Sequence, residues 1–186
     1  NHFLNDLTLD NQKNIYITDS KNSNIYHYHP DSNRLSLFLE DEEIRHPNGI
    51  TISPDDSILY IASHVNGIRI YELATGKFLN DRDTTDRSKG IDGLKYYKNR
   101  LIGIQNGYRE SVRVLEFTLD ESGRRILQAH PMDVNNPYFE TPTTGVVANH
   151  AYYCIANSQL GKLNQDHNQI TDTIPVNPTY ILKYSL

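Results

Sequence analysis

Hydrophobic and polar residues alternate over short stretches of this chain, as they do in half-buried β-strands. In PNGITI, for example, Ile50 and Ile52 alternate with Thr51. Tyrosine and β-branched residues are frequent, and 8 prolines and 10 glycines separate the apolar stretches. This composition favours short strands joined by turns over helices. The pattern therefore predicts an all-β protein.

One phrase of this pattern recurs along the chain. The copies begin at Asn5 with NDLTLDNQKNIYITDSKNSNIYHYHP, at Asn48 with NGITISPDDSILYIASHVNGIRIYEL and at Asp92 with DGLKYYKNRLIGIQNGYRESVRVLEFTL. A weaker copy begins at Thr144 with TGVVANHAYYCIANSQLG and closes with YILKYSL. Each copy is interpreted as a strand, a turn, a strongly apolar second strand, a loop and a third strand. Candidates for a fourth strand are LSLFLE and RILQAHP. Repeats of about 40 to 50 residues are typical of β-propeller blades. We expect residues 1–186 to form a single propeller domain of about four blades, starting near 5, 48, 92 and 144.

The residues that open these units predict a common site. Because the first strand of each propeller blade lines the central channel, Asn5, Asn48, Asp92 and Thr144 should converge near the axis. Their side-chain oxygens are ligands that calcium prefers, and magnesium or manganese would also accept them. Asn or Asp beside Gly also forms turns, which is the simpler interpretation for any single one of them. Three such residues in register favour a cation site.

Three motifs of the chain resemble a known family. Asn5-Asp6 with Asp10, PNGITISPDDSILYIAS and IDGLKYYKNRLIGI are together similar to gluconolactonase and regucalcin (senescence marker protein), and more distantly to paraoxonase. The resemblance implies a six-bladed propeller that holds a divalent cation in its channel, with Ca²⁺ as the expected ion, and hydrolyses lactones or related esters. Because the chain begins at Asn1 inside a strand-like phrase, we expect it to lack two blades of such a propeller.

The resemblance also implies roles for individual residues. Asn48 and Asp92 match the metal-binding residues of the family, and Asn5 matches an asparagine that faces the substrate or the metal. A glutamate ligand from the first blade of the family has no counterpart in this sequence. Phe3 stands where the members that act on sugar lactones carry an arginine, which argues against sugar acid lactones as substrates.

Two residues are candidates for direct contact with a reacting substrate. Asp92 is the best candidate for both metal ligand and catalytic base. Because a bound cation lowers the basicity of a carboxylate, a separate base such as Asp6 or Asp19 stays open, as does a turn-capping role for both. His64 follows the apolar stretch ILYIAS in a loop expected near the channel mouth, so it is a candidate substrate contact. His27 and His29 fall on one face of a strand, and we expect them to be exposed on an outer strand of their blade.

The composition of the chain bears on its possible partners and on its location. The 18 basic and 23 acidic residues give a net charge of −5, which argues against a nucleic-acid partner. No apolar run approaches the roughly 18 residues that cross a membrane, so we expect a soluble protein. Whether it is cytoplasmic, periplasmic or secreted stays open, as does its oligomeric state. Cys154, in AYYCIAN, is expected to be a packed thiol.

Two other functions remain compatible with the same sequence. The chain could be a non-enzymatic propeller of the NHL or YWTD type, which binds a ligand or a partner on one face. It could also be a calcium-binding protein without turnover, since that function needs the same ligands. For the enzyme, the expected partner is a small-molecule lactone or ester.

Overall fold

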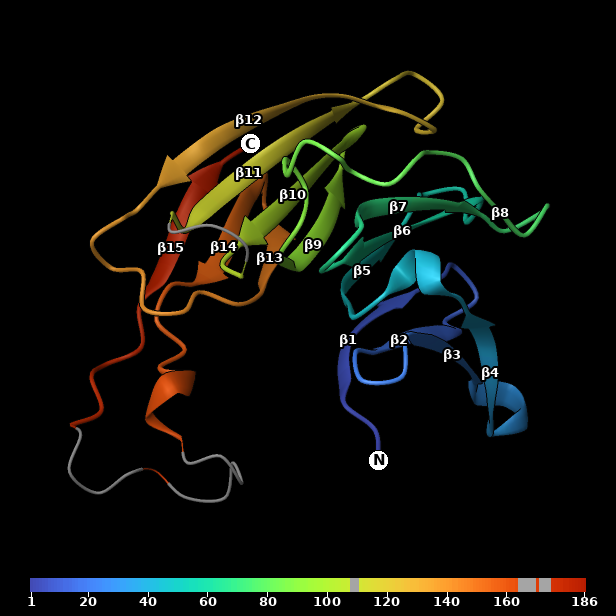
Figure 1. The fold of residues 1–186 in the computed structure, drawn as a ribbon, viewed down its shortest axis with the longest axis horizontal. Coiled ribbons are helices and arrows are strands. Elements are labelled where there is room, and N and C mark those ends of the chain that lie inside the picture. Colours follow the sequence, from blue (N-terminus) through green and yellow to red (C-terminus); the bar gives the residue numbers. More distant parts are fainter. Residues whose placement is uncertain (108–110, 164–169, 171–174) are drawn as a thin grey trace.

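The computed structural model shows four small antiparallel sheets that follow one another in an arc, as the blades of a β-propeller do (Figure 1). The structure describes residues 1–107, 111–163, 170 and 175–186. Blade 1 contains β1 (Leu4–Leu9), β2 (Ile15–Asp19), β3 (Asn24–His29) and β4 (Arg34–Glu40); blade 2 contains β5 (Pro47–Ile52), β6 (Ile58–Ser63), β7 (Gly67–Glu72) and β8 (Lys77–Phe78); blade 3 contains β9 (Ile91–Tyr97), β10 (Arg100–Gln105), β11 (Arg113–Leu119) and β12 (Ile126–Val134); blade 4 contains β13 (Gly145–Ala148), β14 (Ala151–Ile155) and β15 (Ile181–Ser185).

Helical structure in the described residues is confined to three single turns of 3-10 helix, η1 (Pro30–Ser32), η2 (Glu42–Ile44) and η3 (Leu160–Lys162). Within these ranges no helix is long and apolar enough to cross a membrane. The prediction of an all-β propeller is confirmed. The four apolar stretches expected near the middle of their blades form the second strands β2, β6, β10 and β14.

The hydrophobic core lies between successive blades, because each sheet buries side chains on its two faces against its neighbours. Strand β6 shows this directly, since all six of its residues are buried. Alternate β6 side chains belong to different clusters, Leu59 and Ile61 facing blade 1 and Ile58 and Tyr60 facing blade 3. A third cluster joins blades 3 and 4 and includes Cys154, which is 1% exposed. The predicted packed thiol is confirmed.

The expectation for the two histidines of β3 is wrong for His27. Its ring stacks on Tyr16 with centroids 4.2 Å apart and meets Phe38 edge-on. These aromatic residues belong to the core between blades 1 and 2. Burial, followed by the nearby His29, lowers the pKa of His27. The alternation along β3 directs this side chain to the face of blade 1 that packs against blade 2.

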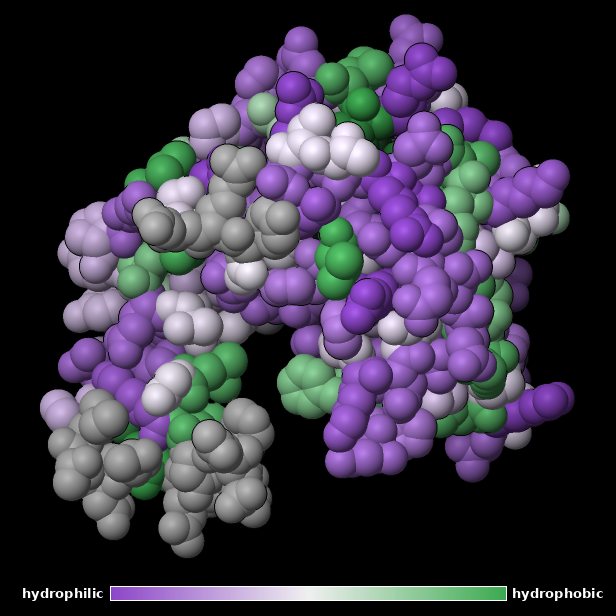
Figure 2. Space-filling model, in the orientation of Figure 1, coloured by the Kyte–Doolittle hydropathy of each residue, from purple (hydrophilic) through white to green (hydrophobic). Residues whose placement is uncertain are grey.

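The outer face of blade 1 is open. Leu7 and Leu9 on β1, and Leu35 and Leu37 on β4, are exposed. In the repeat of blade 2, the residue that corresponds to Leu7 is Ile50, which is fully buried against blade 1. Figure 2 shows a hollow between the first and last blades, with hydrophobic side chains on both of its sides. The described residues therefore form an open arc whose first blade has no neighbour on one face.

Candidate functional site

The first strands β1, β5 and β9 share an irregularity near their starts. Their ladders with the second strands are interrupted after Leu4 in β1, after Pro47 in β5 and after Ile91 in β9. Such an irregularity redirects side chains and often lies beside a functional site. The residues left out of the ladders are Asn5-Asp6, Asn48-Gly49 and Asp92-Gly93. They include three of the four residues predicted from the repeat to face the channel, and the fourth, Thr144, directly precedes β13.

Glycine allows the first strands of neighbouring blades to approach one another closely where their ladders are interrupted. A Cβ atom on Gly49 would lie 2.4 Å from the carbonyl oxygen of Asp92. A Cβ atom on Gly93 would lie 2.8 Å from the carbonyl oxygen of Thr143, which accepts a hydrogen bond of 2.9 Å from the Gly93 N–H. The absence of a side chain at these two positions therefore brings the opening residues of neighbouring blades together.

These opening residues line one cavity of about 410 Å³. Although they lie far apart in the sequence, Asn5, Asn48 and Asp92 all face it. The described residues that line it are Phe3, Asn5, Asp6, Asn48, Asp92, Gly93, Thr143, Thr144 and Leu160. The cavity thus has amide, hydroxyl and carboxylate groups at the starts of the first strands, together with two large apolar side chains.

Asp92 carries the most perturbed charge of this cavity. Burial raises the pKa of its carboxyl group from 3.8 to about 6, and the nearby Asp6 adds to this effect. Hydrogen bonds from the side chains of Asn106 and Asn48 favour the ionised form and oppose the shift only in part. Asn106 Nδ2 lies 2.7 Å from Asp92 Oδ2 and 2.6 Å from the carbonyl oxygen of Pro142. Asn106 therefore fixes the orientation of the Asp92 carboxylate.

Asn106 was missed by the sequence reasoning, although the repeat contains a signal for it. It directly follows the second strand of its blade, and Ser20 holds the same position in blade 1. Ser20 Oγ accepts a hydrogen bond of 3.0 Å from Asn5 Nδ2. In both blades, the residue after the second strand therefore orients the opening residue of the first strand.

His64 holds this position in blade 2, but it is not among the described residues that line the cavity. It is half-buried, and a Cβ atom on Gly107 would lie 2.5 Å from its Cε1 atom. Burial, followed by the nearby His46, lowers its pKa. Its backbone N–H donates to the His46 carbonyl oxygen over 3.1 Å. The structure thus places His64 beside neighbouring loops, and a substrate contact for it stays a prediction.

The second carboxylate of the cavity, Asp6, has a cationic partner. Lys95 Nζ on β9 lies 3.1 Å from Asp6 Oδ2, and both side chains are largely buried. The Asp6 carboxylate also accepts hydrogen bonds from the backbone N–H groups of Leu7 and Ile50, at 2.8 and 3.4 Å. This ion pair connects blade 1 to blade 3 across the channel and neutralises one of the two carboxylates.

The donor set of the cavity fits a hard divalent cation held by one carboxylate. Asp92 supplies that carboxylate, and Asn48 and Asn5 supply amide oxygens that calcium accepts. In the part of the chain that the structure describes, no group of three or more His, Cys, Asp or Glu side chains could hold a metal ion. Because calcium affinity depends on the number of charged ligands, a site of this composition would bind weakly.

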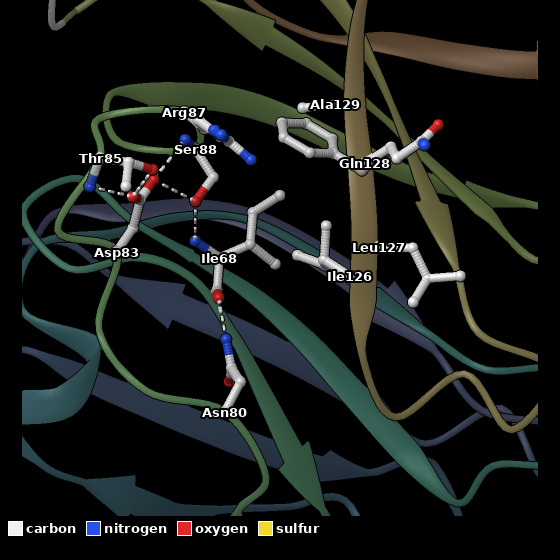
Figure 3. Close-up of a pocket in the computed structure, with 11 residues that line it drawn as sticks. Ile68, Asn80, Asp83, Thr85, Arg87, Ser88, Ile126, Leu127, Gln128 and Ala129 are labelled. Carbon is white, nitrogen blue, oxygen red and sulfur yellow. Dashed lines mark hydrogen bonds between the residues drawn. The ribbon is translucent and has the colours of Figure 1, made fainter.

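A second cavity, of about 170 Å³, lies between β7 and β12 (Figure 3). Its polar groups are engaged in holding a loop. Asp83 accepts hydrogen bonds from the backbone N–H groups of Ser88 and Thr85, at 2.6 and 2.7 Å. Asn80 and Ser88 bond to the backbone of Ile68, in place of a longer β8. These interactions explain the local structure without a ligand, so the channel cavity is the better candidate site.

Comparisons with known proteins support the fold alone. No protein-family model and no curated protein matches the chain. A chain in the crystal structure of a nidogen/laminin complex is similar over 82% of this chain and 56% of its own length, with a TM-score of 0.67 and 12% identity. Selenomethionine-substituted virginiamycin B lyase from Staphylococcus aureus is similar over 82% of this chain and 48% of its own length, with a TM-score of 0.60 and 16% identity. This chain thus spans about half the length of these two proteins.

Proposed function

We propose that this chain carries the site of a divalent-cation-dependent hydrolase that opens lactones or cleaves related esters. The observation that carries the proposal is the state of Asp92. It is a half-buried carboxylate with a raised pKa, oriented by Asn48 and Asn106 and facing a cavity large enough for a small molecule. Perturbed carboxylates in a concave site are candidates for catalysis. The resemblance of the sequence to gluconolactonases supports the same interpretation.

The residues of the chain can perform most of the steps. A bound calcium ion would supply Lewis-acid polarisation of the substrate carbonyl group. Burial raises the pKa of the Asp92 carboxyl to about 6 in the calcium-free protein, and this carboxylate is the group placed to accept a proton from the attacking water. The oxygen of that water then bonds to the carbonyl carbon, the ring C–O bond breaks, and the departing oxygen takes up the proton that Asp92 had accepted, which regenerates the carboxylate. Asn48 and Asn5 orient the carbonyl and ester oxygens, while Asn106 keeps Asp92 in position.

The fold is compatible with catalysis, since virginiamycin B lyase, by its name an enzyme, is built on a similar arrangement. Fold alone does not distinguish catalysis from binding. A calcium-binding protein without turnover would use the same Asp92 and Asn48, and it remains the second candidate function. A propeller that serves only as a scaffold does not need a channel carboxylate that has no cationic partner among the described residues.

The test is a calcium titration by calorimetry of three single variants, combined with a lactonase assay. Asp92→Ala should lose the most affinity, because it removes the only carboxylate of the site that has no cationic partner. Asn48→Ala removes a neutral oxygen and should lose less. Asn5→Ala should mainly lower turnover. Asp31→Ala, in the exposed turn η1, is the matched control and should leave both readouts unchanged.

The outcomes separate the candidates. Calcium binding that depends on Asp92, together with lactone hydrolysis, supports the hydrolase. The same binding without turnover of any lactone or ester supports the calcium-binding protein. Unchanged calcium affinity of Asp92→Ala would overturn both and would make these residues turn formers.

A further inference from the structure

Two apolar side chains stand at the cavity beside its polar groups. Phe3 is 56% exposed and Leu160 is 46% exposed, and both line the cavity. They come from segments far apart in the sequence, since Phe3 precedes β1 and Leu160 begins η3 in blade 4. An exposed aromatic ring and an exposed leucine at the same cavity offer apolar surface to a bound molecule.

The backbone on both sides holds these side chains in place. The Phe3 N–H donates to Asp19 Oδ1 over 3.0 Å, and the Phe3 carbonyl oxygen accepts from the Ser20 N–H over 2.9 Å. Leu160 lies in a turn closed by a 2.9 Å hydrogen bond from the Lys162 N–H to the Gln159 carbonyl oxygen. The apolar part of the cavity is therefore built on anchored backbone.

The charges around the cavity restrict its ligand further. Among the described lining residues there is no lysine, arginine or histidine, while Asp6 and Asp92 are both carboxylates. Lys95 approaches from β9, but it is paired with Asp6. A carboxylate or phosphate group of a ligand would therefore find no cationic side chain among the described lining residues to pair with. A polyhydroxylated ligand would place hydroxyl groups against Phe3 and Leu160, where they would lose hydrogen bonds to water.

We infer that the cavity binds an uncharged lactone or ester with an apolar acyl chain. The acyl chain packs on Phe3 and Leu160, while the carbonyl group of the ligand faces Asn48 and Asp92. This inference rests on the proposed hydrolase function of the same site. It goes beyond that function because it assigns the substrate class and two specificity-determining residues. The cavity volume of about 410 Å³ lies within the range of roughly 300 to 1,000 Å³ that small-molecule sites occupy.

The experiment uses a series of γ-lactones with unbranched alkyl side chains of increasing length and measures kcat/KM for the full 186-residue chain in the presence of calcium. Glucono-δ-lactone is the polyhydroxylated comparison. The matching alkyl γ-lactams, which resist hydrolysis, are titrated by calorimetry. If the alkyl group of the ligand packs on Phe3 and Leu160, kcat/KM and lactam affinity should each rise by up to about fourfold for every methylene group buried.

Two variants locate the effect. Phe3→Ser and Leu160→Ser should each flatten the dependence of kcat/KM and of lactam affinity on the length of the alkyl side chain. Leu35→Ser is the matched control, because Leu35 is 55% exposed on β4 and does not line the cavity. It should keep the full dependence on chain length.

The readouts separate this inference from the proposed function. Lactam affinity that rises with chain length, without hydrolysis of any lactone, supports the ligand class and refutes the hydrolase. Hydrolysis with a preference for glucono-δ-lactone supports the hydrolase and overturns the ligand class. A dependence on chain length that both serine variants retain in full would overturn the assignment of Phe3 and Leu160.

Discussion

The half-buried carboxylate of Asp92 should contribute a destabilisation of the folded, calcium-free protein that is larger at neutral pH than at pH 4. The perturbation that reveals this effect is Asp92→Asn, which keeps the size of the side chain and one of its two hydrogen-bond-accepting oxygens while removing the charge. In the folded protein, burial raises the pKa of Asp92 to about 6, against an ordinary value of 3.8. The variant should therefore be more stable than the wild type at neutral pH, although it loses its proposed function.

The direction of this pH effect on stability follows from the order in which the unfolded and the folded state release the Asp92 proton. Below pH 3.8 the carboxyl group is protonated in both states and has no effect on stability. As the pH rises, the unfolded chain ionises first, so the folded state binds more protons and loses stability until the pH passes about 6. At about 1.4 kcal/mol for each pKa unit, the full loss is about 3 kcal/mol. Between pH 4 and pH 7.5 it is about 2 kcal/mol.

The assay is urea unfolding of the wild type and of Asp92→Asn at pH 4 and pH 7.5 in the presence of a calcium chelator. The free energy of unfolding of the variant, relative to the wild type, should increase by about 2 kcal/mol between the two pH values. Replacing the chelator with calcium should then stabilise only the wild type at pH 7.5, because a bound cation stabilises the state that holds it.

Asp31→Asn serves as the control, because it removes a carboxylate from the exposed turn η1. It should show no comparable change between the two pH values. If Asp92→Asn behaves like this control, Asp92 is not destabilised in the folded state, and the reasoning about its raised pKa is wrong.

Two further predictions concern the surroundings of the site. Gly49→Ala should lower the free energy of unfolding by about 2 kcal/mol or more, because its Cβ atom would lie 2.4 Å from a carbonyl oxygen of β9. Chemical denaturation measures the loss. The control is Gly161→Ala, which has no atom within 4 Å of the added group and should show no such loss from a clash. Lys95→Met should strengthen calcium binding by about tenfold, because it removes a positive charge beside the cavity and frees Asp6; calorimetry that shows equal or weaker binding would mean that Lys95 does not limit the affinity.

Much of the fold is encoded locally and could be predicted from the sequence. The alternation of Ile50 and Ile52 with polar neighbours sets a strand, and the same phrase repeated from Asn5, Asn48 and Asp92 sets successive blades. Because equivalent residues of a repeat take equivalent places, the sequence also predicted that these three residues share a cavity. That they bind a cation remains a prediction.

What only the tertiary structure decided depends on contacts between blades. The ion pair of Lys95 with Asp6 joins residues 89 positions apart, and no local pattern couples them. The burial that raises the pKa of Asp92, and the meeting of Phe3 with Leu160 at one cavity, likewise arise from how closely the blades approach. Strand formation depends on neighbours along the chain, whereas desolvation and ion pairing depend on every group that packing brings near. The sequence by itself therefore determined where the site lies, and the packing of the blades decided its charge and its apolar surface.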